Sequence, residues 1–145
     1  MIRNTAVTVC GPLNVNKLGV TYVHEHLMVK PQLPDEYYIP YTLDDEAAST
    51  EETRSFSAAG GETLVEMTPI NYGRNVKAYQ RIAQATGVHV ICCTGFHKQL
   101  FMPPWFGDKT DGELYDILMD EVTNGLDDTE IHPGVIKLGT SFEEV

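Results

Sequence analysis

The sequence predicts an α/β fold with a mainly parallel sheet, built from about four βα units. Two observations predict it: apolar strand candidates alternate with helix candidates along the chain, and polar residues gather where the strand candidates end. Such alternation implies parallel strands joined by right-handed crossovers. The carboxyl ends of the strands are the edge at which (β/α)8 barrels build active sites. We therefore expect the N-terminal half of a (β/α)8 TIM barrel, preceded by a short β-hairpin.

Four short apolar segments are the strand candidates. They cover residues 19–26, 63–68, 88–94 and 134–138. Before them, the segment AVTVCGPLNV predicts a small hairpin around Gly11 and Pro12, because glycine and proline mark tight turns.

Three helix candidates separate these strands, and each presents one apolar face to a sheet. The first follows Thr42, with Asp45 three residues on, and the third follows Thr110, with Glu113 three residues on, so both resemble a capping box. Apolar residues recur at helical spacing in the second helix (Val76, Tyr79, Ile82, Ala83) and in the third (Leu114, Ile117, Leu118, Val122, Leu126). Gly60, Gly61 and Gly87 stand where a helix must end before the next strand.

An open, doubly wound sheet is the competing architecture. No Gly-x-Gly-x-x-Gly motif follows any strand candidate, so a nucleotide site is not supported. Polar residues at the ends of successive strands favour the barrel instead. They are His24, His26, Glu66, Thr68, Thr94, His97 and Lys137.

Composition narrows the function classes. With 42% hydrophobic and 21% charged residues, residues 1–145 form one globular domain or part of one. The net charge of −11 and the lack of a basic cluster argue against nucleic acid as a partner. No apolar run is long enough for a membrane span or a signal peptide, so we expect no membrane partner and a cytoplasmic location. Three cysteines, two of them adjacent, suit reduced thiols better than a disulfide framework.

The stretch GVTYVHEHL raises a metal site as a hypothesis. In a regular strand, Val20, Tyr22, His24 and His26 line one face and Glu25 the other. Two imidazoles would then converge, and neutral imidazole is a common ligand of divalent transition metals. Chance spacing of two histidines is the alternative.

Four segments together resemble a known family. They are GVTYVHEHL, GGETLVEMTPINYGRNV, VICCTGFHK and GVIKLGTSFEEV. In this order and spacing they resemble the N-terminal half of the phosphotriesterase-like family, within the amidohydrolase superfamily. The most specific elements are the His-x-His pair of His24 and His26 and the lysine Lys137 in its GVIK setting.

The resemblance implies a metal-dependent hydrolase of a small molecule. It implies two divalent metal ions, usually zinc, with His24 and His26 as ligands and a hydroxide bridging the pair. It also implies that Lys137 is carboxylated by carbon dioxide and bridges the metals, where an ammonium would be repelled. The implied substrate is an ester, a lactone or a phosphotriester. A snorkelling surface lysine is the alternative for Lys137.

Three further residues are secondary site candidates. The resemblance places His97 at a position that contacts substrate, and Trp105 in the same loop could wall a pocket. Glu66 could orient a ligand histidine from behind. The alternatives are an exposed loop position for His97, a packing role for Trp105 and an ion pair elsewhere for Glu66.

The four units are half of what such a barrel needs, since a complete one takes about 250 residues. Further histidine ligands and an aspartate belong to later strands in the family. We therefore expect this chain by itself to be an inactive half, with open sheet edges that favour self-association. A remnant or interaction module without metal is the alternative function.

Overall fold

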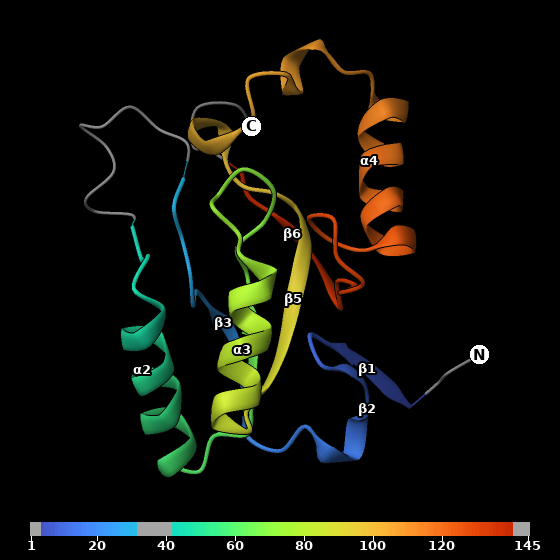
Figure 1. Cartoon of the computed structure of the whole chain (residues 1–145). Coiled ribbons are helices and arrows are strands. Elements are labelled where there is room, and N and C mark those ends of the chain that lie inside the picture. Colours follow the sequence, from blue (N-terminus) through green and yellow to red (C-terminus); the bar gives the residue numbers. More distant parts are fainter. Residues whose placement is uncertain (1–3, 32–41, 141–145) are drawn as a thin grey trace.

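The described residues form two separate sheets. The structure is a computed structural model that describes residues 4–31 and 42–140. A hairpin pairs β1 (Thr5–Thr8) with β2 (Gly11–Asn14), and a second sheet has the parallel order β3-β4-β5-β6 (Figure 1). The strands of the second sheet are β3 (Thr21–Glu25), β4 (Thr63–Glu66), β5 (His89–Phe96) and β6 (Val135–Leu138).

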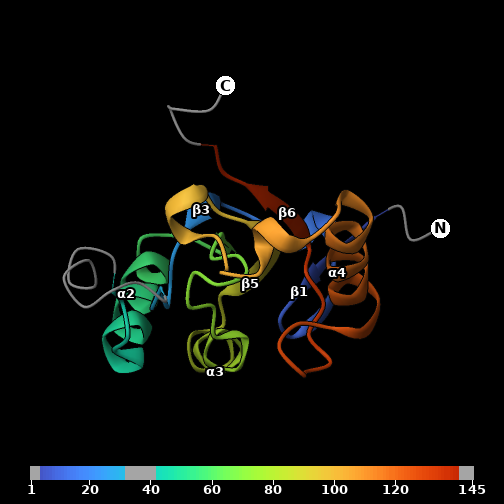
Figure 2. The same ribbon diagram turned by 90° about the horizontal axis from the view of Figure 1, so that it is seen from above.

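Helices connect the parallel strands. They are α2 (Glu46–Ala58), α3 (Val76–Thr86) and α4 (Asp111–Asn124), with short 3-10 turns at η1 (Val15–Lys17), η3 (Gln99–Phe101) and η4 (Phe106–Asp108). Figure 2 shows α2, α3 and α4 along one side of the curved sheet. This is the arrangement of half a (β/α)8 barrel, as the alternating pattern predicts. No helix in the described ranges is long and apolar enough to cross a membrane.

The main core lies between the sheet and α3. Its buried residues include Leu64 on β4, Val90 and Cys92 on β5, and Tyr79 and Ile82 on α3. Phe56 of α2 packs against the same cluster. The core therefore occupies the helix side of the sheet.

The N-terminal hairpin closes one end of this core. The amide of Val9 donates to the carbonyl of Val90 at 2.8 Å, and Val9 is buried. Its connection is made by Val9 and Cys10, because Thr8 pairs with Gly11 and Pro12 already lies in β2. The turn is thus two residues earlier than the prediction around Gly11 and Pro12.

The caps of the helices confirm two predictions and correct one. Thr110 and Glu113 form the expected capping box of α4, and Gly87 ends α3 with φ of 76°. The first helix does not start after Thr42. Asp45 is its N-cap and accepts from the amides of Ala47 and Ala48. The helix starts later than predicted because Leu43 forms backbone hydrogen bonds with Val29 in an isolated antiparallel bridge.

Helix α4 is packed more loosely than its apolar pattern predicts. None of its residues is buried, and Tyr115, Met119 and Val122 are exposed. Leu126, just beyond the helix, is the fully buried residue of the predicted set. Ile136 on β6 is likewise 62% exposed.

Candidate metal centre and active-site rim

An irregularity in β3 decides how its side chains point. Tyr22 pairs with Leu64 and Glu25 with Glu66, so β3 advances three residues where β4 advances two. A bulge of this kind interrupts the alternation of faces. Tyr22 turns to the helix side, where its ring lies 4.8 Å from that of Phe56. The prediction that Tyr22 and His24 share a face is therefore wrong.

His24 points to the opposite, concave side. Its Nε2 atom lies 3.3 Å from Nζ of Lys137 on β6, with β4 and β5 between the two strands. Side chains of strands so far apart in the sheet order can meet only across the inside of a curled sheet. Lys137 is 8% exposed, and none of the described carboxylates forms an ion pair with it. It is not a snorkelling surface lysine.

His26 follows the end of β3 and stands beside His24, with ring centroids 5.4 Å apart. Its Nδ1 atom lies 2.8 Å from the hydroxyl of Thr68, which donates to Oε1 of Glu66. Because Thr68 has one hydroxyl hydrogen and donates it to Glu66, its oxygen is left to accept from Nδ1–H of His26. This chain of contacts favours the tautomer whose Nε2 lone pair is available to a metal.

Glu66 is fully buried at the end of β4. Burial raises the pKa of its carboxyl to about 7, while hydrogen bonds from Thr68 and from the amide of Leu27 oppose that shift. The carboxylate lies 3.7 Å from Nδ1 of His26. The structure thus brings Glu66 behind a candidate ligand histidine, with Thr68 between them.

His97, just after β5, joins the same cluster through aromatic contacts. Its ring lies 4.6 Å from Tyr72 and stacks on Phe101 at 4.8 Å and 14°. Its Nδ1 atom is buried and has no hydrogen-bond partner among the described residues. Trp105 lies elsewhere in the loop, 6.2 Å from the ring of Phe96 and 37% exposed. A role for Trp105 with substrate stays a prediction.

The donor set suits a divalent metal in its chemistry. Burial, reinforced by nearby positive groups, lowers the pKa of His26 and of His97 to about 4 each. The imidazoles are therefore neutral at pH 7, the form that binds metal. Within the described ranges, no three His, Cys, Asp or Glu side chains form a ready metal-binding group. His24 lies close to both His26 and Lys137, and the role of these three residues as metal ligands stays a prediction.

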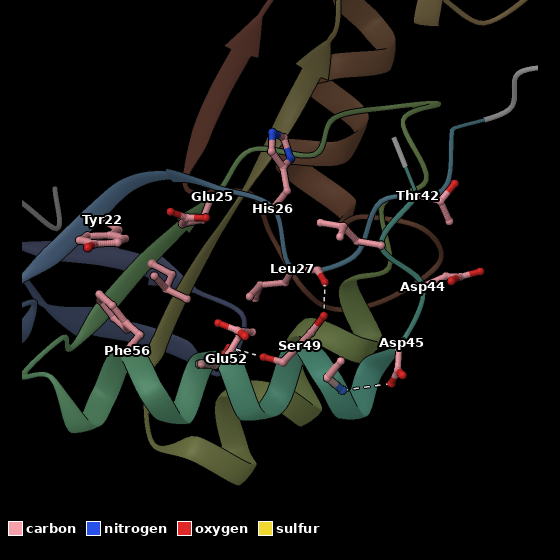
Figure 3. A pocket seen from close by; sticks show the side chains of 14 residues that line it. Tyr22, Glu25, His26, Leu27, Thr42, Asp44, Asp45, Ser49, Glu52 and Phe56 are labelled. Carbon is pink, nitrogen blue, oxygen red and sulfur yellow. Dashed lines mark hydrogen bonds between the residues drawn. The ribbon is translucent and has the colours of Figure 1, made fainter. Parts of the chain in front are cut away.

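A cavity of about 460 Å³ adjoins His26 on the helix side of the sheet. Figure 3 shows it between β3 and α2, with Tyr22 facing Phe56 and His26 at one end. Carboxylates line much of its polar surface: Glu25, Asp44, Asp45 and Glu52. Because Tyr22 is 54% exposed, this cavity opens beside the free edge of β3.

Comparison with known proteins settles the family. Residues 4–145 match the sequence model of the Phosphotriesterase family. The chain belongs to the phosphotriesterase family. Among curated members, it is 32% identical to the phospho-furanose lactonase of Mycoplasmopsis synoviae, over 98% of this chain and 45% of that protein. It is 31% identical to the N-acetyltaurine hydrolase of Danio rerio, over 97% of this chain and 49% of that protein.

Solved structures of phosphotriesterase-like proteins share the fold. An amidohydrolase from Mycoplasma synoviae superposes with a TM-score of 0.86 at 32% identity, covering 98% of this chain and 45% of that one. A lactonase from Listeria monocytogenes gives 0.83 at 28% identity, with 91% and 46% covered. The chain therefore spans about half the length of these family members, as the half-barrel prediction requires.

Two residues of the rim escaped the sequence prediction of the site. Thr68 was visible only as a polar residue at a strand end, and Tyr72 lies in the loop that follows. Their roles depend on how that loop folds back over β3 and β5, which no spacing rule reveals. The final residues of the fourth family segment, 141–145, lie outside the described residues.

Proposed function

We propose that this phosphotriesterase-family chain belongs to a metal-dependent hydrolase that acts on an ester, a lactone or a phosphotriester. The observation that carries the proposal is the 3.3 Å approach of Lys137 to His24, beside His26. Three nitrogen donors from two strands thus meet at the rim where barrel enzymes work. The substrate is a small molecule with a hydrolysable acyl or phosphoryl group. Parts of the barrel other than these strands determine which such molecule is bound.

His24, His26 and Lys137 would hold part of a centre of two divalent ions, with zinc proposed as the metal. Such a centre supplies Lewis-acid polarisation of the electrophilic oxygen and lowers the pKa of water towards about 7. The protein's own contribution is orientation. Thr68, itself bound to Glu66, contacts Nδ1 of His26, which favours a free lone pair on Nε2.

Lys137 is proposed to bridge the metals as a carbamate. Its neutral amine attacks the carbon of carbon dioxide, an N–C bond forms and one N–H proton leaves. The product carries two oxygens and one negative charge where an ammonium would repel two cations. Lys137 is buried and forms no ion pair with a described carboxylate. This position supports a role other than that of a salt-bridge partner.

His97 and Trp105 complete the proposal as residues that contact substrate. His97 is neutral and lies with the cluster, whereas Trp105 would act from the η3–η4 loop. A cytoplasmic location is also proposed, and the free state of Cys10, Cys92 and Cys93 supports it.

Zinc binding tests the proposal directly. The purified chain is titrated with zinc in competition with a chromophoric chelator, alongside His24→Asn, His26→Asn and the double variant. We expect the parent to bind zinc and the double variant to lose it, while His89→Asn, at the far end of β5, binds as the parent does. Stoichiometric zinc in the double variant would overturn the assignment of His24 and His26 as ligands, and a parent that binds no zinc would leave the interaction module without metal.

Activity requires the rest of the barrel. In a protein that contains it, the double variant should lose ester or lactone hydrolysis together with its metal. The 145-residue chain alone should show no turnover, because His24, His26 and Lys137 give two metals too few ligands. Turnover by the isolated chain at about 1 per second or faster would contradict this expectation.

A further inference from the structure

Tyr72 occupies the centre of the rim cluster. It lies in the loop between β4 and α3 and is 8% exposed. Its ring contacts His26 edge-on at 5.6 Å and 80°, and lies 4.6 Å from that of His97. His26 follows β3 and His97 follows β5, so one side chain touches histidines from two different strands. It also meets Phe101 at 4.6 Å.

We infer that Tyr72 is a positioning residue that sets the ring orientation of both His26 and His97. The inference rests on the proposed function, since it concerns the same rim. Nothing in the sequence pattern assigns this role. It follows from the contacts, because an imidazole flanked by packed aromatic rings has few ring planes open to it.

The two histidines are constrained in different ways. His26 is held at Nδ1 by Thr68 and along one ring edge by Tyr72. His97 packs against Tyr72 and stacks on Phe101, and these two rings also contact each other. Loss of the Tyr72 ring would therefore free one side of His97 and leave His26 with its hydrogen bond alone.

The loop that carries Tyr72 is itself firmly placed. Nδ2 of Asn71 donates to the carbonyl of Phe101 at 3.2 Å, and Ile70 bridges to Phe96. Gly73, with φ of 79°, approaches the backbone of Lys30 so closely that a Cβ would lie 2.1 Å from its nitrogen. The ring of Tyr72 is thus presented from a fixed backbone, as a positioning role requires.

The anchor on the other side of Tyr72 is Arg74. Its guanidinium, 4% exposed, pairs with Glu121 and with Asp127 at 2.6 Å each. The loop is therefore tied to β5 through Phe96, to η3 through Phe101 and to α4 through Arg74.

The test compares Tyr72→Leu, which removes the ring, with Tyr72→Phe, which keeps it. Tyr115→Leu is the matched control, because Tyr115 is 62% exposed on α4. Two readouts are used: the zinc affinity of the chain, and the rate at which diethyl pyrocarbonate modifies each histidine of the metal-free protein, mapped by mass spectrometry. Circular dichroism checks that each variant is folded.

We expect Tyr72→Leu to weaken zinc binding about tenfold, the lower end of the effect of residues that orient metal ligands. Modification of His26 and His97 should become several-fold faster, while His89 and His132 keep their rates. Tyr72→Phe and Tyr115→Leu should match the parent. If Tyr72→Leu does not fold, Tyr72→Met fills the space without a rigid ring and serves the same comparison.

A folded Tyr72→Leu or Tyr72→Met protein with the parent's zinc affinity and histidine reactivity would overturn the inference. Parental behaviour in Tyr115→Leu but not in Tyr72→Phe would also overturn it, because the hydroxyl rather than the ring would then matter. A parent that fails to bind zinc overturns the proposed function instead. In that case the reactivity of the metal-free histidines still decides the role of Tyr72.

Discussion

Nζ of Lys137 and Nε2 of His24 lie 3.3 Å apart although 113 positions separate the residues in sequence. In a flat sheet, strands three positions apart would be roughly 14 Å from one another. The contact is therefore a direct result of sheet curvature. His24 and Lys137 therefore stay in contact only while β3 and β6 remain at the two edges of the described sheet.

Replacement of Lys137 by alanine should abolish hydrolysis in a protein that contains the complete barrel. The cause is loss of the proposed carbamate, which an added short carboxylic acid should partly replace. Hydrolysis rate and zinc content are measured with and without acetate, with the exposed Lys109→Ala as control. A Lys137→Ala enzyme with parental rate and zinc content would show that Lys137 is no bridge.

Glu66 should make the stability of the metal-free protein depend on pH. Its folded pKa, about 7, exceeds the ordinary value of 4.5, so the folded state binds a proton that the unfolded state has released. The stabilisation by this proton is complete below pH 4.5 and is lost as the pH rises through 7. At full ionisation the free energy of unfolding is lower by about 3 kcal/mol.

Urea unfolding of Glu66→Gln and the parent at pH 5 and pH 8, values chosen to bracket the folded pKa of about 7, checks this. The difference between the two proteins should change with pH, because only the parent has the Glu66 carboxyl. Glu52→Gln, at an exposed site, should follow the parent. A constant difference between Glu66→Gln and the parent would rule out the raised pKa.

Arg74→Met should be among the more destabilising changes in the chain. It removes the partner of Glu121 and Asp127 and a donor to the carbonyl of Cys93. Removal of one member of a buried ion pair costs about 3 to 5 kcal/mol, and we expect the lower end because Asp127 is 42% exposed. Arg54→Met, at a surface pair, should change the free energy of unfolding by less than about 1 kcal/mol. Equal effects of the two in chemical denaturation would contradict a buried anchor.

Gly95 is expected to tolerate no side chain. It pairs in register with Lys137, and a Cβ there would lie 1.9 Å from the carbonyl oxygen of Lys137. Gly60→Ala is the matched control, because Gly60 also has positive φ but open space around it. Thermal unfolding should show Gly60→Ala destabilised by about 1 kcal/mol and Gly95→Ala by clearly more. A Gly95→Ala protein as stable as Gly60→Ala would mean that β6 adjusts without cost.

The free edges of the sheet should make the isolated chain associate with itself. Val23 on β3 and Leu138 on β6 are each 72% exposed, and unpaired parallel edges invite further strands. Size-exclusion chromatography with light scattering should give a mass above the 16.1 kDa of one chain. Val23→Lys with Leu138→Lys should reduce association, and Tyr115→Lys, also highly exposed, should not. A monomeric parent at high concentration would refute the prediction.

Much of the fold could be predicted from the sequence because the patterns that indicate it involve residues close together in the chain. The capping box at Thr110 and the terminating Gly87 depend on a few adjacent residues, and both are present in the structure. The same rule misplaced the first helix, since Thr42 and Asp45 fit a capping box as well as Asp45 fits an N-cap. The backbone pairing of Leu43 with Val29 decides between them, and that pairing is not local.

The site could be predicted from the sequence only where residue type and spacing indicate the same function. Two histidines and a lysine stand out by residue type, and the structure brings all three together. No residue type in β3 signals the bulge, so the side of the sheet to which Tyr22 points was predicted wrongly. Thr68 enters through a hydrogen bond to His26 across 42 positions, a relationship that only the folded backbone creates.

The strands of the larger sheet stand side by side in the order in which they are synthesised, β3-β4-β5-β6. Each strand leaving the ribosome can dock on the one before it, and no strand has to wait for a distant partner. Pairing of consecutive strands closes shorter stretches of chain than pairing of distant ones would, so it costs less conformational entropy. Translation can thus assemble the histidine side of the rim first, and Lys137 reaches it as the last of the described strands arrives.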